Sequence, residues 1–216
     1  MAQRTIHLLL GKIMLENVNI KNRNRFLLGS VIPDAIESLS MRNTTHFIKE
    51  LEDEGKWYFD LYGFRERYEE LMKTDDLYLG YYMHLVEDTL YRNFLYRDYQ
   101  FASHFKTEEE IKTLHNDYRL LNMHIVKQFG LKNTIERPVN FERERINEVV
   151  PFCLDVFLEE MDKDFLPFDN GTTTVLLTEN LLDEFIEKYA MLCVTELVAV
   201  KKGEKYLNPF TYIWSK

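Results

Sequence analysis

Cysteine, glycine and proline are all scarce in this chain of 216 residues, which contains 2, 8 and 5 of them respectively. With so few turn-forming residues, a β-sandwich rich in tight turns is disfavoured and long helices are expected. The two cysteines, Cys153 and Cys193, both lie in apolar stretches, and their spacing gives no reason to pair them. We interpret them as buried free thiols, as is usual for cysteines in such surroundings.

Long apolar runs are also missing, since no stretch of 18 apolar residues occurs, and no membrane-spanning helix is expected. The N-terminal segment MAQRTIHLLLGKIML has one arginine, a short apolar run and an early histidine, which is not the pattern of a signal peptide. We therefore expect a cytoplasmic location. The net charge of −9 gives no general attraction to nucleic acid or to an anionic membrane, so neither is expected as a partner. The sequence leaves the oligomeric state open.

Apolar residues make up 45% of the chain, and aromatic residues, with 13 tyrosines and 15 phenylalanines, make up 14%. This composition can form a substantial core, and the length suits one domain. Apolar periodicity and capping residues predict a series of helices. They cover about residues 5–17, 46–54, 57–72, 76–97, 107–129, 142–162 and 179–201. We therefore predict an all-α fold: a single-domain multi-helix bundle over residues 1–216, with a metal site buried between its helices.

Three local features refine this prediction. The segment 76–97 is apolar around nearly its whole circumference, which is typical of a buried helix. Gly130 is a plausible C-terminal cap for helix 107–129. In the turn GSVIPDA, Asp34 follows a proline and is expected to begin a short helix.

Histidine and aspartate occur four residues apart in HLVED, as His84 and Asp88, inside the helix expected to be most buried. On a helix this spacing puts both side chains on one face, about one turn apart. Burying a carboxylate without a partner costs several kcal/mol or forces its protonation, so the pair needs a partner. A hydrogen bond within the helix would satisfy it. A divalent metal such as Zn²⁺, whose ligands are imidazole and carboxylate, would satisfy it as well.

Three more residues of these types have distinctive surroundings. His7 lies in the first turn of an amphipathic helix, Asp34 follows Pro33, and His46 follows a run of capping residues. Each position alone has an ordinary structural explanation. Together with His84 and Asp88, they suggest a metal site assembled from several helices.

The motifs GSVIPDA, THF and HLVEDTLY resemble, in order and in wording, those of the zinc-dependent phospholipase C family, which shares its all-helical fold with the S1/P1 nucleases. Gly29 to Asp34 match a G-x-x-x-P-D turn, and His46 follows twelve residues later. His84 and Asp88 match the central H-x-x-x-D pair. The resemblance covers about residues 5–95.

The resemblance implies that Asp34, His46, His84 and Asp88 hold one zinc ion. It further implies that Asp88 bridges to a second metal bound by His7, and that Asp34 is also a candidate general base. In the family, such metals bind a phosphate ester and activate water for attack on phosphorus. One or two ions, Zn²⁺ or another divalent metal, are expected.

The chain departs from the family pattern in two places. Six residues precede His7, so a terminal amine is not expected among the ligands. The family's third metal needs a histidine shortly after the central pair and then an H-x-x-x-E motif. His104 and Glu108 have the spacing of that motif, but they follow His84 and Asp88 too closely. A third metal is therefore not expected.

His115 and His124 lie about 13 Å apart on one predicted helix, cannot share a metal, and are interpreted as surface or partly buried residues.

Several polar residues near the pair allow two interpretations. Glu87 is an alternative carboxylate or a base behind the ligands, or else a solvated or arginine-paired residue, which is the interpretation we favour. Arg92 is expected to pair structurally, with binding of a phosphate oxygen as the alternative. Asp117, Tyr118 and Asn122 could line the same pocket, but we do not favour this.

We therefore predict a metal-dependent phosphoester hydrolase in which metal-activated water is the nucleophile. Its substrate is a phospholipase C-like lipid phosphoester or a small soluble one, and the small soluble phosphoester is favoured. Two other classes remain: a non-catalytic metal-binding helical protein that retains part of the metal cluster, and an interaction module whose histidines and aspartates make only buried polar contacts.

Overall fold

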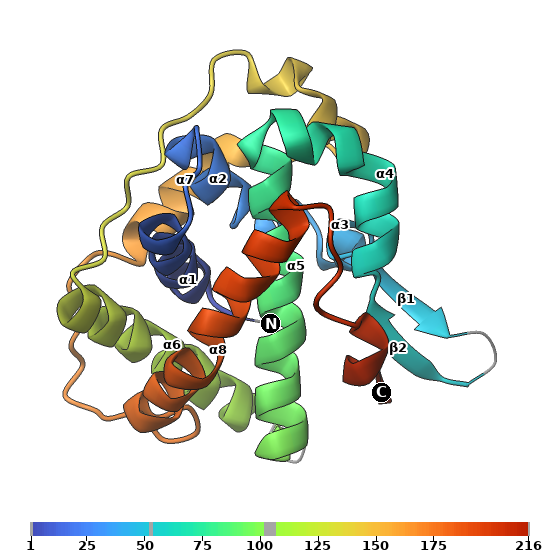
Figure 1. Ribbon diagram of the computed structural model, residues 1–216. Coiled ribbons are helices and arrows are strands. Elements are labelled where there is room, and N and C mark those ends of the chain that lie inside the picture. The colour runs from blue at the N-terminus through green and yellow to red at the C-terminus, as the bar shows by residue number, and fades with distance from the viewer. Residues whose placement is uncertain (1, 52–53, 102–106, 216) are drawn as a thin grey trace.

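The computed structural model describes residues 2–51, 54–101 and 107–215, and it is mainly helical, as predicted (Figure 1). The helices are α1 (Arg4–Asn17), α2 (Arg23–Gly29), α3 (Arg42–Thr45), α4 (Leu61–Thr74), α5 (Asp76–Arg92), α6 (Glu108–Phe129), α7 (Leu154–Lys163) and α8 (Glu179–Lys201). Short 3-10 turns are η1 (Ile32–Asp34), η2 (Leu39–Met41), η5 (Phe141–Arg143), η6 (Arg145–Glu148) and η7 (Pro209–Tyr212). A π-helical turn, η3 (Asn93–Asp98), continues α5. None of the helices in the described part of the chain is long and apolar enough to cross a membrane.

Helix α5 runs through the middle of the molecule, with α1 and α8 on one side of it and α4 on the other (Figure 1). Every residue from Leu77 to Tyr91 is buried, which confirms the prediction made from its apolar circumference. Any polar side chain in this stretch of α5 must therefore find its partners inside the protein.

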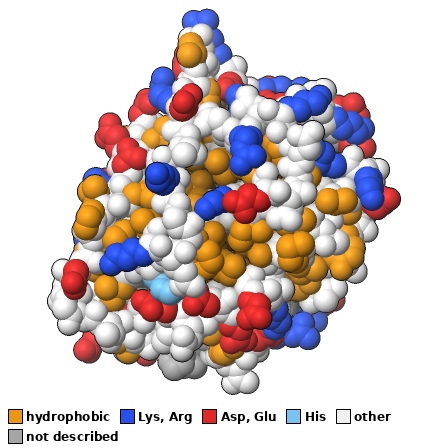
Figure 2. Space-filling model, turned by 60° about the vertical axis from the view of Figure 1, so that its left-hand side comes forward, with side chains coloured by type: hydrophobic (Ala, Val, Ile, Leu, Met, Phe, Trp, Pro, Cys, Tyr) orange, Lys and Arg blue, Asp and Glu red, His pale blue; other side chains and the backbone are white. Residues whose placement is uncertain are grey.

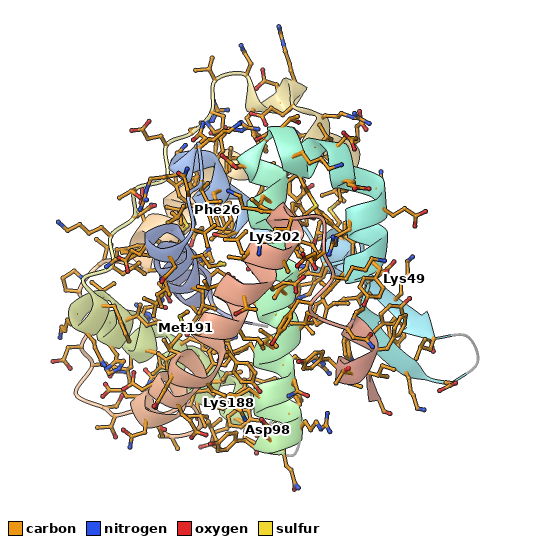
Figure 3. The ribbon with its side chains drawn as sticks, viewed as in Figure 1. Phe26, Lys49, Asp98, Lys188, Met191 and Lys202 are labelled. Carbon is orange, nitrogen blue, oxygen red and sulfur yellow. The ribbon has the colours of Figure 1, made fainter. Side chains whose placement is uncertain are left out.

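Beyond that stretch, where η3 continues α5, Lys188 of α8 bonds to Asp98 at 2.9 Å (Figure 3).

The ends of the two longest helices were predicted correctly. Helix α6 begins with a capping box between Thr107 and Glu110 and ends at Gly130, which has the left-handed φ of +57°. Helix α8 is capped by the Thr178 side chain, which accepts a hydrogen bond from the backbone N–H of Leu181. Both cysteines are free thiols; Cys193 is buried and Cys153 is partly exposed.

A small sheet replaces two predicted helical segments. Strands β1 (Ile48–Leu51), β2 (Lys56–Phe59) and β3 (Trp214–Ser215) pair antiparallel in that order, with Ile48 opposite Phe59 and Trp57 opposite Trp214. The helix predicted over 46–54 is therefore wrong, and helix 57–72 begins only at Leu61, after its cap Asp60. The lysines, glutamates and leucines here favour helix weakly, and pairing with a neighbouring strand overrides that preference.

Two further predictions were wrong in detail. Asp34 ends the 3-10 turn η1 rather than beginning a helix, and the chain leaves helical geometry after it. The predicted helix 142–162 forms only from Leu154 onward, as α7, with 3-10 turns before it. Pro151 explains the late start, because a proline has no N–H to donate and disfavours helical geometry in the residue before it.

Helices α2 and α5 approach each other closely through two glycines. A β-carbon added to Gly80 would lie 2.0 Å from the carbonyl oxygen of Phe26, and one added to Gly29 would lie 2.0 Å from that of Leu77. The close approach matters for the residue that follows α2, because it brings the carbonyl of Ser30 to the side chain of His84 at 2.8 Å.

We predict that Gly80→Ala lowers the free energy of unfolding by about 2–3 kcal/mol, because the methyl group forces two backbones apart in a packed core. Urea denaturation measures the change. Gly11→Ala is the matched control, since the nearest atom there is a side-chain carbon of Leu27 at 2.9 Å, which can move. Equal losses in the two variants would contradict the close-packing argument.

Candidate metal centre

Five side chains from four segments meet beside α5. His84 and Asp88 come from α5, His7 from α1, Asp34 from the end of η1, and His46 from the residue that caps the C-terminus of α3. Tyr81 fixes α3 against α5 by donating its hydroxyl to the carbonyl of Thr45 at 2.6 Å. All five are the residues predicted as metal ligands, and the fold brings all five together.

Three donor atoms of this group have mutual spacings close to those of a tetrahedral site, and a fourth lies near one of them. The Nε2 atom of His46 lies 3.1 Å from Nε2 of His84, 3.3 Å from Oδ1 of Asp34 and 3.5 Å from Oδ2 of Asp88. Nε2 of His84 lies 3.7 Å from the same Oδ2 atom. Ligands placed tetrahedrally about 2.0–2.2 Å from Zn²⁺ are about 3.3–3.6 Å apart, so the atoms of His46, His84 and Asp88 fit such an ion. Asp34, which also groups with His7 and His84, lies at ligand spacing from His46.

Hydrogen bonds at Nδ1 determine which ring nitrogen of His84 and His46 carries the proton. Nδ1 of His84 lies 2.8 Å from the Ser30 carbonyl, and Nδ1 of His46 lies 3.1 Å from the Arg42 carbonyl. A carbonyl oxygen only accepts, so both Nδ1 atoms carry the proton. In the neutral rings, the two Nε2 atoms therefore present lone pairs to each other across 3.1 Å. A cation between them removes this repulsion.

His7 faces the same carboxylate from another direction. Its ring stacks on that of His84 with centroids 4.0 Å apart, and its Nε2 atom lies 3.6 Å from Oδ1 of Asp88. That oxygen accepts the backbone N–H of Ala2 at 2.8 Å. Nε2 of His7 and Oδ2 of Asp88 are buried and have no hydrogen-bond partner among the described residues. Both atoms are therefore available to metal ions on the two sides of the Asp88 carboxylate.

Glu87 has a different place from the one favoured from the sequence. It is fully buried rather than solvated or arginine-paired, and its Oε2 atom lies 2.5 Å from Nδ1 of His7. A carboxylate behind a ligating histidine fixes its tautomer and raises its basicity. The sequence did contain a signal for this role, because an acid within a helix that is apolar all round needs an internal partner.

We predict that Glu87→Gln weakens metal binding by about 10–100-fold, the usual loss when a partner behind a ligand is changed. The amide can still accept from His7 but no longer carries charge. Competition with a chromogenic chelator measures the affinity. Glu196→Gln is the control: this fully buried acid of α8 bonds to Tyr82 and to the N–H of Leu207 instead. Unchanged affinity in Glu87→Gln would show that the carboxylate does not support the ligand.

Opposing effects set the ionisation of the cluster. Burial disfavours the charge on His7, but the adjacent carboxylates of Asp88 and Glu87 outweigh it and raise its pKa to about 10. Burial and the nearby His7 charge lower the pKa of His84 to about 3. Burial raises the pKa of Glu87 to about 7 against the pull of His7. At neutral pH, a metal-free site thus keeps His84 neutral and stores a proton on His7.

The carboxylates that face the histidines are held ionised. Burial opposes the charged form of Asp34, yet the adjacent His46 and the nearby His84 and His7 hold its pKa well below the usual range. The same balance, with His7 as the main partner, lowers the pKa of Asp88. Ionised carboxylates and neutral imidazoles are the forms that ligate a metal.

Metal binding is expected to strengthen as pH rises from 6 to 8. The pKa of His7 lies above this range, so the metal-free protein carries its proton, and the metal-bound protein loses it. Each unit of pH should raise the apparent affinity by up to about tenfold. Chelator competition at pH 6, 7 and 8 measures the slope, and His7→Gln should flatten it. An affinity constant across this range in the unmodified protein would contradict the assignment.

A pocket of about 660 Å³ opens next to the cluster. Asp34 is the only one of the five residues that lines it, and its side chain is 23% exposed while the other four are fully buried. Tyr118 and Asn122 also line the pocket, against the favoured interpretation. Asp117 does not: it accepts the backbone N–H groups of residues 175–177.

The remaining sequence candidates lie away from the cluster. His115 is exposed at the rim of the pocket, and His124 is partly buried and bonds to Asp183 at 3.0 Å, as expected for residues outside the metal site. His104 lies outside the described residues. Arg92 was expected to form an ion pair, but its guanidinium lies over the rings of Tyr96 and Trp214.

Comparison of the chain with protein-family models, curated proteins and solved structures gave no match. The resemblance to zinc-dependent phospholipases C therefore stays a prediction carried by the motifs themselves.

Proposed function

We propose that this protein is a divalent-metal-dependent hydrolase of phosphoesters, with Zn²⁺ as the ion that best suits its donors. One observation supports the proposal most strongly: acceptor atoms of His46, His84 and Asp88 converge in a buried space, and Oδ2 of Asp88 has no hydrogen-bond partner among the described residues. Nitrogen and oxygen donors at tetrahedral spacing favour zinc over Mg²⁺ or Ca²⁺, which take six or more oxygen ligands.

The ligand set divides into one nearly complete site and one partial site. Asp34, His46, His84 and Asp88 would hold the first ion. His7 and the other oxygen of Asp88 would contribute to a second, with Glu87 supporting His7. When bound, such ions lower the pKa of a water molecule toward about 7 and neutralise charge on a phosphoryl group.

Asp34 has the position of a catalytic residue. It is the one member of the cluster that reaches the pocket, and its carboxylate stays ionised because of His46. It can therefore accept a proton from a water molecule in the pocket or orient that water toward a phosphoester. The other four residues are enclosed by protein, so their part is to hold charge in place.

Elemental analysis followed by a screen of chromogenic phosphoesters tests this proposal. We expect at least one zinc per chain and measurable hydrolysis. His84→Ala should lose both, whereas Asp34→Asn should lose most activity while keeping more of the metal. A chain that binds zinc in stoichiometric amount but hydrolyses no phosphoester would be a non-catalytic metal protein. A chain that takes up no divalent metal would have only buried polar contacts here, and the hydrolase proposal would be wrong.

A further inference from the structure

The pocket beside Asp34 is unusually rich in arginine. Arg4 of α1, Arg42 of α3 and Arg119 of α6 all line it, and together with Tyr96 and Tyr118 they form what we call the arginine pocket. The whole chain carries a net charge of −9, and charges of both signs are interspersed on the face in Figure 2. Three guanidinium groups from distant parts of the sequence around one pocket are therefore a local feature rather than a reflection of composition.

Two of these arginines are held in fixed positions. Nε of Arg4 bonds to Asp164 at 2.7 Å, and the other oxygen of Asp164 accepts from Asn122 at 3.1 Å. The guanidinium of Arg119 lies over the ring of Phe168, 3.9 Å from its centroid. Guanidinium groups that are already oriented lose less entropy when they bind a carboxylate or a phosphate, so they are suited to recognise anions.

The acidic residues in the pocket lining cancel only part of this charge, because Asp164 neutralises Arg4 and leaves Arg42 and Arg119. They are Asp164, which is paired with Arg4, and Asp34, which would serve the metal ion. Burial raises the pKa of Tyr118 well above its usual value, so its hydroxyl stays protonated and can donate a hydrogen bond. The pocket next to the metal centre thus carries positive charge and donors. It favours an anionic group and disfavours a cationic one such as choline.

The volume of the pocket sets the size of the ligand. About 660 Å³ lies within the usual range for small-molecule sites, which is about 300–1,000 Å³. It can hold a phosphate at Asp34 and a few more atoms that reach the arginines.

We propose that the arginine pocket binds a second anionic group of the substrate, so that the preferred substrates are small phosphoesters whose leaving group carries a carboxylate or a further phosphate. This proposal rests on the proposed hydrolase function, because it places the scissile phosphate at the metal centre. It adds the chemical class of the leaving group and the residues that select it.

Binding of two phosphonates that cannot be hydrolysed tests the proposal without catalysis. Phosphonoacetate carries a carboxylate next to its phosphonate, and methylphosphonate does not. Calorimetric titration of the zinc-loaded protein should show at least about tenfold tighter binding of phosphonoacetate, as expected for one charge-assisted contact. Arg119→Gln and Arg42→Gln should each remove most of this preference and leave methylphosphonate binding nearly unchanged. Lys127→Gln is the control, because it removes a positive charge from the same helix α6 outside the pocket.

Hydrolysis of three matched esters gives the second measurement. The expected order of kcat/KM is 3-phosphoglycerate, then glycerol 3-phosphate, then phosphorylcholine, whose leaving groups are anionic, neutral and cationic. Equal binding of the two phosphonates, or equal rates with the three esters, would overturn the proposal while leaving the hydrolase function intact. If the protein binds no zinc, the hydrolase function fails, and the phosphonate titration then tests the arginine pocket by itself. A preference for phosphonoacetate that depends on Arg119 would support the anion site. No preference would show that the anion site is wrong as well.

Discussion

Asp88→Asn is expected to bind divalent metal at least about a hundredfold more weakly than the unmodified protein, the largest effect expected of any single ligand change. Asp88 is the one residue whose two oxygens face different histidines, with Oδ2 near His46 and His84 and Oδ1 near His7. Removing one charged partner from a buried group costs about 3–5 kcal/mol, which corresponds to a hundred- to several-thousandfold in affinity.

The same substitution should not harm the metal-free fold. The new amide N–H₂ group can donate to the lone pairs of His46 and His84, which face each other across 3.1 Å. We expect the metal-free variant to stay folded, with a melting temperature no higher than that of the unmodified metal-free protein, because the charge that supports the proton on His7 is lost. Equilibrium dialysis with zinc and thermal melts measure the two effects.

The control for Asp88→Asn is Asp117→Asn, since Asp117 is equally buried but accepts three backbone N–H groups far from the cluster. It should lose stability and keep zinc. If Asp88→Asn bound zinc as well as the unmodified protein, the cluster would not be a metal site. If it lost zinc only because it unfolded, the melt of the metal-free variant would show it.

Removal of the metal is the second large effect. A ligand that binds only the folded state stabilises it by about 4 kcal/mol when its concentration is a thousandfold above its Kd. For a chain of this size, each kcal/mol shifts the melting temperature by about 2–4 °C, so a chelator should lower it by about 8–16 °C. Zinc added back in excess should restore it.

The chelator effect must disappear in His84→Ala, because that variant lacks one of the four closely spaced donors. The melting temperature of His84→Ala itself shows whether that variant folds. Thr5→Ala is the control: it removes a buried hydrogen bond between α1 and Asn122, so it should lower stability but keep the chelator effect. A melting temperature that does not respond to chelator or to zinc in the unmodified protein would contradict a metal bound in the folded state.

The sequence predicted the long helices and the meeting of five polar residues for clear physical reasons. The spacing of His84 and Asp88 places both on one face of α5, and the apolar surroundings of that helix require an internal partner for them. The turn at Pro33 and the position of His46 supplied the rest, although the three residues before His46 lie in α3 instead of capping a helix that begins at His46. Their convergence is now a structural observation, whereas the identity of any ion that they bind remains a proposal.

The parts that the sequence did not predict depend on tertiary contacts. Strand β1 consists of Ile48, Lys49, Glu50 and Leu51, which have no strong preference for a strand, and only pairing with β2 gives them that conformation. Glu87 and Arg92 were assigned by their charge to solvent or ion pairs. The first instead lies behind His7, and the second lies against two aromatic rings. Such partners come from α1 and from β3 and are not visible in local spacing.

All five clustered residues come from the first 88 positions of the chain, whereas Tyr118, Arg119, Asn122 and Asp164 in the pocket wall come from α6 and the segment after α7. The clustered donors are thus encoded in the first stretch of sequence, whereas the pocket lining is shared between Arg4 and Arg42 of that stretch and the later residues. Variation in the later stretch can change which molecules are accepted without disturbing the donor atoms. A library confined to the pocket-facing positions of α6 is therefore a direct way to redirect this scaffold to new compounds.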